Sequence, residues 1–134
     1  MSEKIKILAA ENKFLKLISG GEELVLDETK RTTVWVYEMG EKDATFAQMF
    51  GSLSNDLNKL CLTYAHIKNF VKKYRNWLRI DGYGTFFLFK VGDKFFVVSV
   101  SINSAGLVVR VHRFESSAWW SGGGRRRLVV PQLT

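Results

Sequence analysis

The chain lacks the residues from which several common kinds of site are built. It contains a single cysteine, Cys61, which excludes an intramolecular disulfide framework and a zinc site made from paired cysteines. No apolar run approaches the roughly 18 residues that a membrane-spanning helix needs, and the first residues carry mixed charges, unlike a signal peptide. We therefore expect a soluble cytoplasmic protein, in a reducing setting, with no membrane partner.

Catalytic and cofactor motifs are also scarce. His66 and His112 lie on different predicted elements without a local carboxylate, and their spacing matches no zinc motif. The glycines at 122–124 are not followed by the Lys-Ser/Thr pair of a phosphate-binding loop. We expect no catalytic residue, no metal site and no cofactor, while a small ribonuclease using His66 and His112 stays open as a third alternative.

Acidic residues are almost missing from the second part of the chain. The formal net charge is +7, and residues 1–60 hold eight Lys and Arg against ten Asp and Glu, whereas residues 61–134 hold twelve against three. A net positive field raises the local concentration of polyanions and speeds their encounter. Nucleic acid is therefore the expected partner, although basic charge can also serve solubility alone.

Length and patterning predict one α+β domain that spans residues 1–134. We expect antiparallel strand groups on either side of a central helical segment. The first group is a hairpin around Gly20-Gly21, from 13–18 and 23–27, followed by a strand at 32–38. The second is a three-stranded meander at 85–91, 94–102 and 107–114, and residues 128–130 are a candidate for a fourth strand.

The central segment shows apolar residues at helical spacing. Residues from 43 to about 60 form one stretch, and a second helix begins after the N-cap Thr63 and runs to about Leu78. On the second helix, one narrow stripe beside the apolar face carries four cations and no interleaved acid: Lys68, Lys72, Arg75 and Arg79. This stripe is either a solvated surface or a binding site for an anion.

Alternation along the meander assigns its side chains to two faces. One face is purely apolar and is expected to be the core face; it holds Phe87, Phe89, Phe96, Val98, Val100, Ile102, Leu107, Val109 and Val111. The other is mixed and holds Phe86, Leu88, Lys90, Phe95, Val97, Ser99, Ser101, Val108, Arg110, His112 and Phe114. The mixed face fits a base-stacking surface and, equally well, a second core layer under a helix.

Residues 115–127 form the third candidate region, which we expect to be a flexible arm. Trp119 and Trp120 offer stacking surfaces, a glycine hinge follows, and Arg125, Arg126 and Arg127 can pair with phosphates. Each feature alone is common in cores or on solvated surfaces. Their combination around one hinge favours binding.

These patterns lead to the hypothesis of a non-catalytic, sequence-tolerant binder of single-stranded DNA or RNA. Its expected contacts are Lys68, Lys72, Arg75, Arg79, Lys90, Arg110, Arg125, Arg126 and Arg127 for phosphates, and Phe86, Phe95, Trp119 and Trp120 for bases, with Trp35 as a further stacking candidate. The runner-up hypothesis is a protein-interaction module, with a homodimer as one form, because aromatic and Arg side chains also mark protein interfaces.

Overall fold

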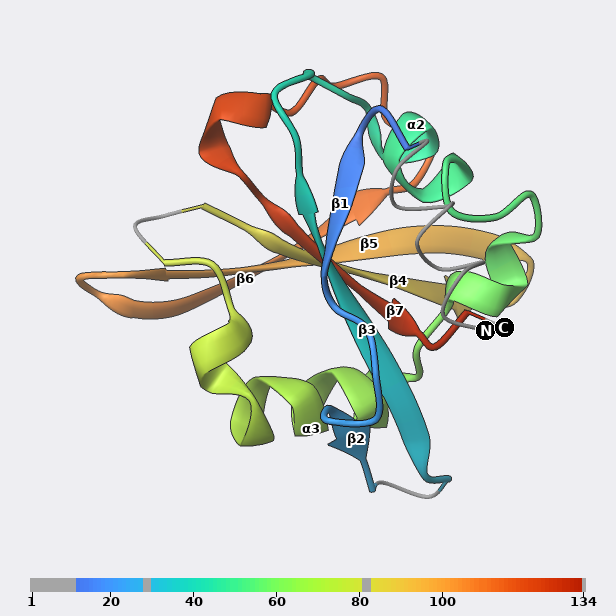
Figure 1. Ribbon diagram of the computed structural model, residues 1–134, viewed down its shortest axis with the longest axis vertical. Helices are drawn as coiled ribbons and strands as arrows, with labels where there is room; N and C mark the ends of the chain where they lie inside the picture. The colour runs from blue at the N-terminus through green and yellow to red at the C-terminus, as the bar shows by residue number, and fades with distance from the viewer. Residues whose placement is uncertain (1–11, 28–29, 81–82, 134) are drawn as a thin grey trace.

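The chain folds into one strongly twisted sheet with helices packed on both faces (Figure 1). The computed structural model describes residues 12–27, 30–80 and 83–133. Within these residues, the sheet has seven strands: β1 (Leu15–Ser19), β2 (Val25–Leu26), β3 (Thr32–Met39), β4 (Thr85–Val91), β5 (Lys94–Asn103), β6 (Gly106–Arg113) and β7 (Arg127–Pro131). The strand order is β1-β3-β7-β4-β5-β6, with β2 paired to β3 off this path. The α+β class is confirmed.

The two expected strand groups are joined into one sheet. β7 lies between β3 and β4, antiparallel to the first and parallel to the second. Its residues Leu128, Val129 and Val130 are fully buried, which explains the short unbroken apolar run. The candidate strand at 128–130 is therefore confirmed, and it is central rather than an addition to the edge.

The predicted N-terminal hairpin is wrong. β1 and β2 do not pair with each other; both pair with β3, at Leu15↔Met39 and Val25↔Thr33. The chain thus runs along one edge of β3, and the segment between the two strands bulges out of the ladder. Gly20 and Gly21 do not have the positive φ of a tight hairpin turn, which Gly92 does have between β4 and β5.

The helical segment is broken into short pieces. It contains α2 (Phe46–Gly51), η1 (Leu57–Leu60), α3 (Tyr64–Lys73) and η2 (Arg75–Trp77), and η3 (Gly122–Gly124) follows later. Thr63 caps α3 by accepting a hydrogen bond from the His66 amide, as predicted. The expected continuation to Leu78 is wrong, because Tyr74 leaves the helical conformation at φ −121° and the last turn tightens into η2. No helix in the described part of the chain is long and apolar enough to cross a membrane.

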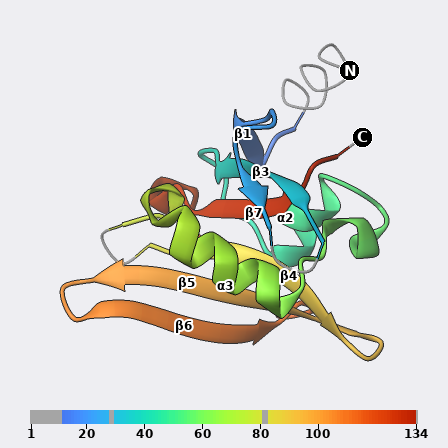
Figure 2. The same ribbon diagram turned by 90° about the horizontal axis from the view of Figure 1, so that it is seen from below.

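Each face of the sheet carries its own core layer. Phe46, Met49 and Phe50 of α2 pack on one face, against the rings of Trp35 and Phe86 among others. On the other face, Ile67 and Phe70 of α3 pack with Phe87, Val98 and Val129. Figure 2 shows α3 along this second face, with β6 as the outermost strand beyond β5.

The expected core face of the meander is only partly covered. Val98 and Val100 on β5 are buried, but Leu107, Val109 and Val111 on β6 are 39%, 56% and 60% exposed. The α3 layer buries β3, β7, β4 and β5 side chains, and no β6 side chain belongs to it. The prediction that these three residues lie in the core is wrong.

Candidate functional site

A cavity lies on the mixed face of the β5–β6 hairpin. It has a volume of about 290 Å³, and its lining is Gly84, Ser99, Ser101, Asn103, Val108, Arg110, His112, Trp120 and Arg126. Alternation along β5 and β6 turns the lining strand residues to one side of the sheet. Trp120 and Arg126 come from the segment after β6, so the two candidate regions of the sequence meet here.

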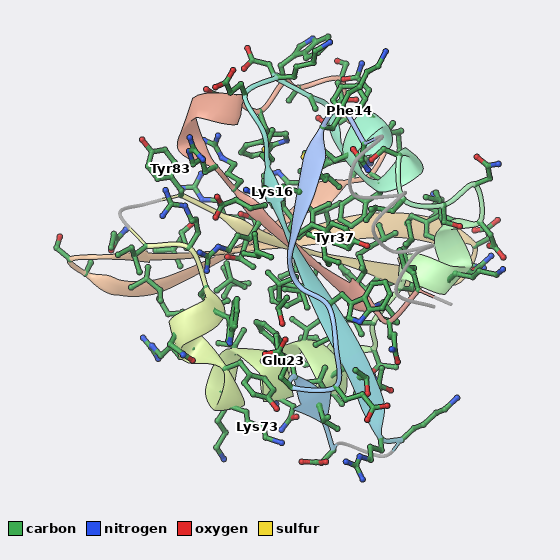
Figure 3. All side chains as sticks on the ribbon, in the orientation of Figure 1. Phe14, Lys16, Glu23, Tyr37, Lys73 and Tyr83 are labelled. Carbon is green, nitrogen blue, oxygen red and sulfur yellow. The ribbon has the colours of Figure 1, made fainter. Side chains whose placement is uncertain are left out.

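A stack of alternating cations and rings extends from the cavity lining, which contains Trp120 and Arg126, to Tyr83 and Arg79 beside it. The guanidinium carbons of Arg79 and Arg126 each lie 5.4 Å from the Tyr83 ring centroid, and that of Arg126 lies 5.1 Å from the Trp120 ring centroid. Figure 3 shows Tyr83 beside η3 at the upper left, and Lys73 at the lower end of the molecule. Such contacts contribute about 0.5–1 kcal/mol each at exposed sites. They hold the Arg126 guanidinium against the Tyr83 and Trp120 rings.

The segment that carries Trp120 and Arg126 is anchored by its backbone. Trp120 and Ala44 exchange two backbone hydrogen bonds of 2.8 and 3.0 Å, and the Gly122 amide donates to Asp43. A Cβ atom on Gly122 would lie 2.4 Å from the Glu41 backbone, so only glycine fits at this close approach. Residues 120 and 122 are thus anchored to residues 43 and 44. The role of residues 115–127 as a flexible binding arm stays a prediction.

The Trp120 ring is held from behind by other aromatic rings. Its centroid lies 5.0 Å from that of Phe86, 5.3 Å from Phe46 and 5.4 Å from His112. The indole is therefore a fixed wall of the cavity. Trp119 beside it is 63% exposed, so its ring is open to solvent.

The cavity is lined by cations and by side chains that contain buried polar nitrogens. Within residues 12–27, 30–80 and 83–133, no carboxylate lies within 4.0 Å of the charged atoms of Arg79, Arg110 or Arg126. Within the same ranges, three buried nitrogens of the lining residues have no hydrogen-bond partner: His112 Nε2, Trp120 Nε1 and Arg126 Nε. These nitrogens are buried and not open to a ligand in the cavity, and an unpaired buried polar group costs about 1–3 kcal/mol.

Burial also affects the titration of two lining residues. It lowers the pKa of the Arg126 guanidinium, and burial followed by the nearby Arg110 charge lowers the pKa of His112. An imidazole with a lowered pKa is neutral at pH 7. Cationic charge at the cavity therefore comes from the arginines.

The structure brings together part of the predicted site. Arg110, Arg126 and Trp120 line the cavity, and Arg79 is joined to Arg126 through the Tyr83 ring beside it. Arg125 is exposed next to them and lies 4.0 Å from Glu38, the limit of an ion pair. Arg79 does not continue the helical stripe as expected, since it lies beyond η2 and its Nε donates to the Gly124 and Arg125 carbonyls.

Other predicted residues lie elsewhere. Lys68 and Lys72 are exposed on α3, in the layer on the opposite face of the sheet, and Arg75 begins η2 after that helix. Lys90 and Phe95 lie at the far end of the β4–β5 hairpin, about 17 Å along the strand from Thr85, where Lys90 donates to Asn58. Arg127 is committed to Glu38, at 3.2 Å, and to the Trp77 carbonyl.

Two of the rings predicted to stack on bases are buried. Phe86 and Trp35 are both 0% exposed and belong to the α2-side core. The prediction that they stack on bases is wrong, because both rings lie in the core layer under α2. Phe95 is half-buried and packs against the same core.

The two histidines are not brought together. His66 on α3 lies 2.8 Å from the Lys30 carbonyl, whereas His112 contacts Phe46 and Trp120 in the opposite layer. A ribonuclease that needs both rings at one phosphodiester has no geometric support here.

Sequence reasoning missed Tyr83, which links Arg79 to Arg126. An aromatic residue beside Gly84 in a turn gives little signal, because both cation partners come from distant parts of the chain. Ser99, Ser101 and Asn103 were recognisable only as strand or turn residues.

Comparison with known proteins yielded no match to a family model, to a curated protein or to a solved structure. The functional argument therefore rests on the geometry of the cavity and its surroundings.

Proposed function

We propose that the protein binds single-stranded nucleic acid without catalysis and with little sequence preference, using the cavity and the neighbouring Trp119. The observation that supports this most directly is that Arg110 and Arg126 line one cavity with Trp120 while Arg79 packs on Tyr83 beside it. None of the three arginines has a carboxylate partner in the described residues. Arginine pairs with phosphate oxygens, and exposed indoles stack on bases of any identity.

The size of the cavity favours a flexible strand. About 290 Å³ is at the lower end for a small-molecule site, which suits one nucleotide unit rather than a longer segment. A duplex, with a persistence length near 150 base pairs, cannot readily bend one unit into a recess. A single strand can place a phosphate at Arg110 and Arg126 while a neighbouring base stacks on Trp119.

The first test is titration of labelled oligonucleotides at several salt concentrations, followed by fluorescence anisotropy. Oligo-dT, oligo-U and a duplex of equal length separate DNA from RNA and single from double strands. If the three arginines contact about three phosphates, log K should fall against log salt with a slope near −2. An affinity that does not depend on salt, or a preference for the duplex, would contradict the proposal.

A matched pair of charge variants locates the site. Arg110→Ala removes a cation from the cavity, while Lys90→Ala removes one from the far end of the same sheet face. We expect Arg110→Ala to weaken binding and to make the salt slope shallower by about 0.7, with Lys90→Ala close to the unaltered chain. Equal losses in the two variants would show diffuse attraction without a site.

Stacking is tested separately. Trp119→Ala should cost roughly 1–3 kcal/mol of binding free energy, as loss of a base-stacking ring does. Because Trp119 is 63% exposed, the change should leave the thermal unfolding of the protein almost unaltered.

A further inference from the structure

The outer face of β6 carries an exposed apolar row that the proposed nucleic-acid site does not use. Leu107, Val109 and Val111 are 39%, 56% and 60% exposed and project from the same side of one strand. On the opposite side, Val108, Arg110 and His112 line the cavity. An exposed apolar row is unusual for an edge strand, where charged or kinked residues ordinarily prevent association.

The backbone of β6 is also open. It is the last strand in the sheet order, and no strand in the described ranges pairs with its outer edge (Figure 2). Alternate residues of Gly106–Arg113 direct their amide and carbonyl groups away from β5, so these groups are free to pair with another strand.

We propose that a second copy of this chain occupies this edge, and that two β6 strands pair antiparallel across a two-fold axis at Val109. In this register Leu107 lies opposite Val111 of the other copy, so the two apolar rows meet on one face. Each Arg110 lies opposite Val108, and the two arginines are not directly opposed. A register centred at residue 110 would place the two arginines face to face, which is destabilising.

Charge favours a second copy over an acidic partner. The chain carries a net charge of +7, yet the row from Leu107 to Val111 has no charged side chain on its face. Arg113 follows the row on the same side of β6, but in the proposed register it lies beyond the paired residues 107–111. An acidic partner would find no cation within the row itself. The neutral row is a place where two like-charged copies can meet, and a two-fold contact closes on itself and gives a dimer.

The arrangement is continuous with the candidate site. Both cavities would lie on the same side of one extended sheet, on either side of the two-fold axis. The dimer does not depend on nucleic-acid binding, since the contact is made by the other face and the edge of β6.

Cysteine cross-linking tests the register directly. In a Cys61→Ser background, Val109→Cys should form an intermolecular disulfide on mild oxidation, because directly opposed residues have Cα atoms about 4.5–5.5 Å apart. Val111→Cys alone should not, because the two copies of that residue would be about 13 Å apart. A mixture of Leu107→Cys and Val111→Cys chains should form the mixed disulfide.

Sedimentation equilibrium of the full chain tests the association itself. The unaltered chain should be a dimer, and Val109→Lys, which opposes two ammonium groups at the axis, should be a monomer with an unchanged circular dichroism spectrum. Ile80→Lys is the control, since Ile80 is 53% exposed and lies outside every strand; it should stay dimeric.

Three outcomes would overturn the proposal. A monomeric unaltered chain at about 100 µM, well above ordinary micromolar dissociation constants, would exclude the dimer. A Val109→Lys chain that remains dimeric would place the contact elsewhere. Self-cross-linking of Val111→Cys as efficient as that of Val109→Cys would exclude the register.

Discussion

The two sides of the β5–β6 hairpin differ in chemistry, although alternate residues of the same two strands form them. One side holds serines, Arg110 and His112 around a cavity, and the other holds Val98 and Val100 on β5 with Val109 and Val111 on β6. On the apolar side the β5 valines are buried and the β6 valines are exposed. On the mixed side Phe86 and Val97 are core, whereas Ser99, Ser101 and Arg110 line the cavity, although Ser99 is only 6% exposed.

The difference shows that alternation assigns a side chain to a face but does not decide whether that face is covered. Cover comes from α2 and α3, which each reach only part of the sheet. A face can therefore be core at one end and a binding surface at the other.

The largest expected effect is a loss of stability at the buried end of the mixed face, which distinguishes that end from the cavity. Phe86→Ala should reduce the free energy of unfolding by about 3–5 kcal/mol, because it empties a fully buried site against Phe46 and Trp120. Urea denaturation measures this. A loss below about 1 kcal/mol, together with weaker oligonucleotide binding, would return Phe86 to the stacking surface.

The second comparison uses two valines that face each other across β5 and β6. Val100 is 1% exposed and its partner Val109 is 56% exposed. Val100→Ala should cost roughly 2 kcal/mol, because deleted buried methyl groups leave a cavity. Val109→Ala should cost less than about 0.5 kcal/mol in the monomer, as surface changes do. Urea titrations at low protein concentration would contradict this picture if the two losses were equal.

A smaller effect distinguishes two neighbouring arginines beside the cavity. Arg126→Gly removes contacts to two rings and should destabilise by about 1–2 kcal/mol. Arg125→Gly should stabilise slightly, by about 0.5 kcal/mol, because φ at Arg125 is 48° and glycine adopts this conformation freely. Thermal unfolding of both variants should show shifts of opposite sign, and a matching decrease would refute the strain argument.

The smallest expected effect is the pH dependence of stability that His112 causes on the cavity side. Burial and then Arg110 lower the pKa of His112 in the folded chain, so protonation favours the unfolded chain. The contribution of His112 to stability is present above the unfolded value, near 6.5, and is lost as pH falls toward the lower folded value. Denaturation between pH 5 and 8 should show a steeper acid loss for the unaltered chain than for His112→Gln. Parallel curves would exclude the effect.

Much of the local structure could be predicted from the sequence. The turn at Gly92 and the cap at Thr63 depend on neighbours in the chain, and both were predictable. The pairing of β1 and β2 with β3, in place of each other, could not be read from local patterns. Nor could the central place of β7, which pairs with β3 residues nearly 100 positions earlier.

The sequence predicted the types of residue in the candidate site, but not which of the candidate residues would line the cavity. Arg110, Arg126 and Trp120 were recognised as cations and a ring, and the structure brings them together. Lys68, Lys72 and Lys90 carry the same signal but lie outside the cavity lining, because charge patterning does not report which face of a sheet a helix covers. Tyr83 contacts Arg79 and Arg126, which only the fold brings to its ring.

The position of β7 has a consequence for how the protein is made. During synthesis β3 and β4 leave the ribosome well before residues 127–131, and each then has one edge without its final neighbour. The sheet can close only when this late segment inserts between them. Nascent chains should therefore need protection from aggregation until residues 127–131 have emerged, and removal of this segment should leave two half-sheets that do not assemble.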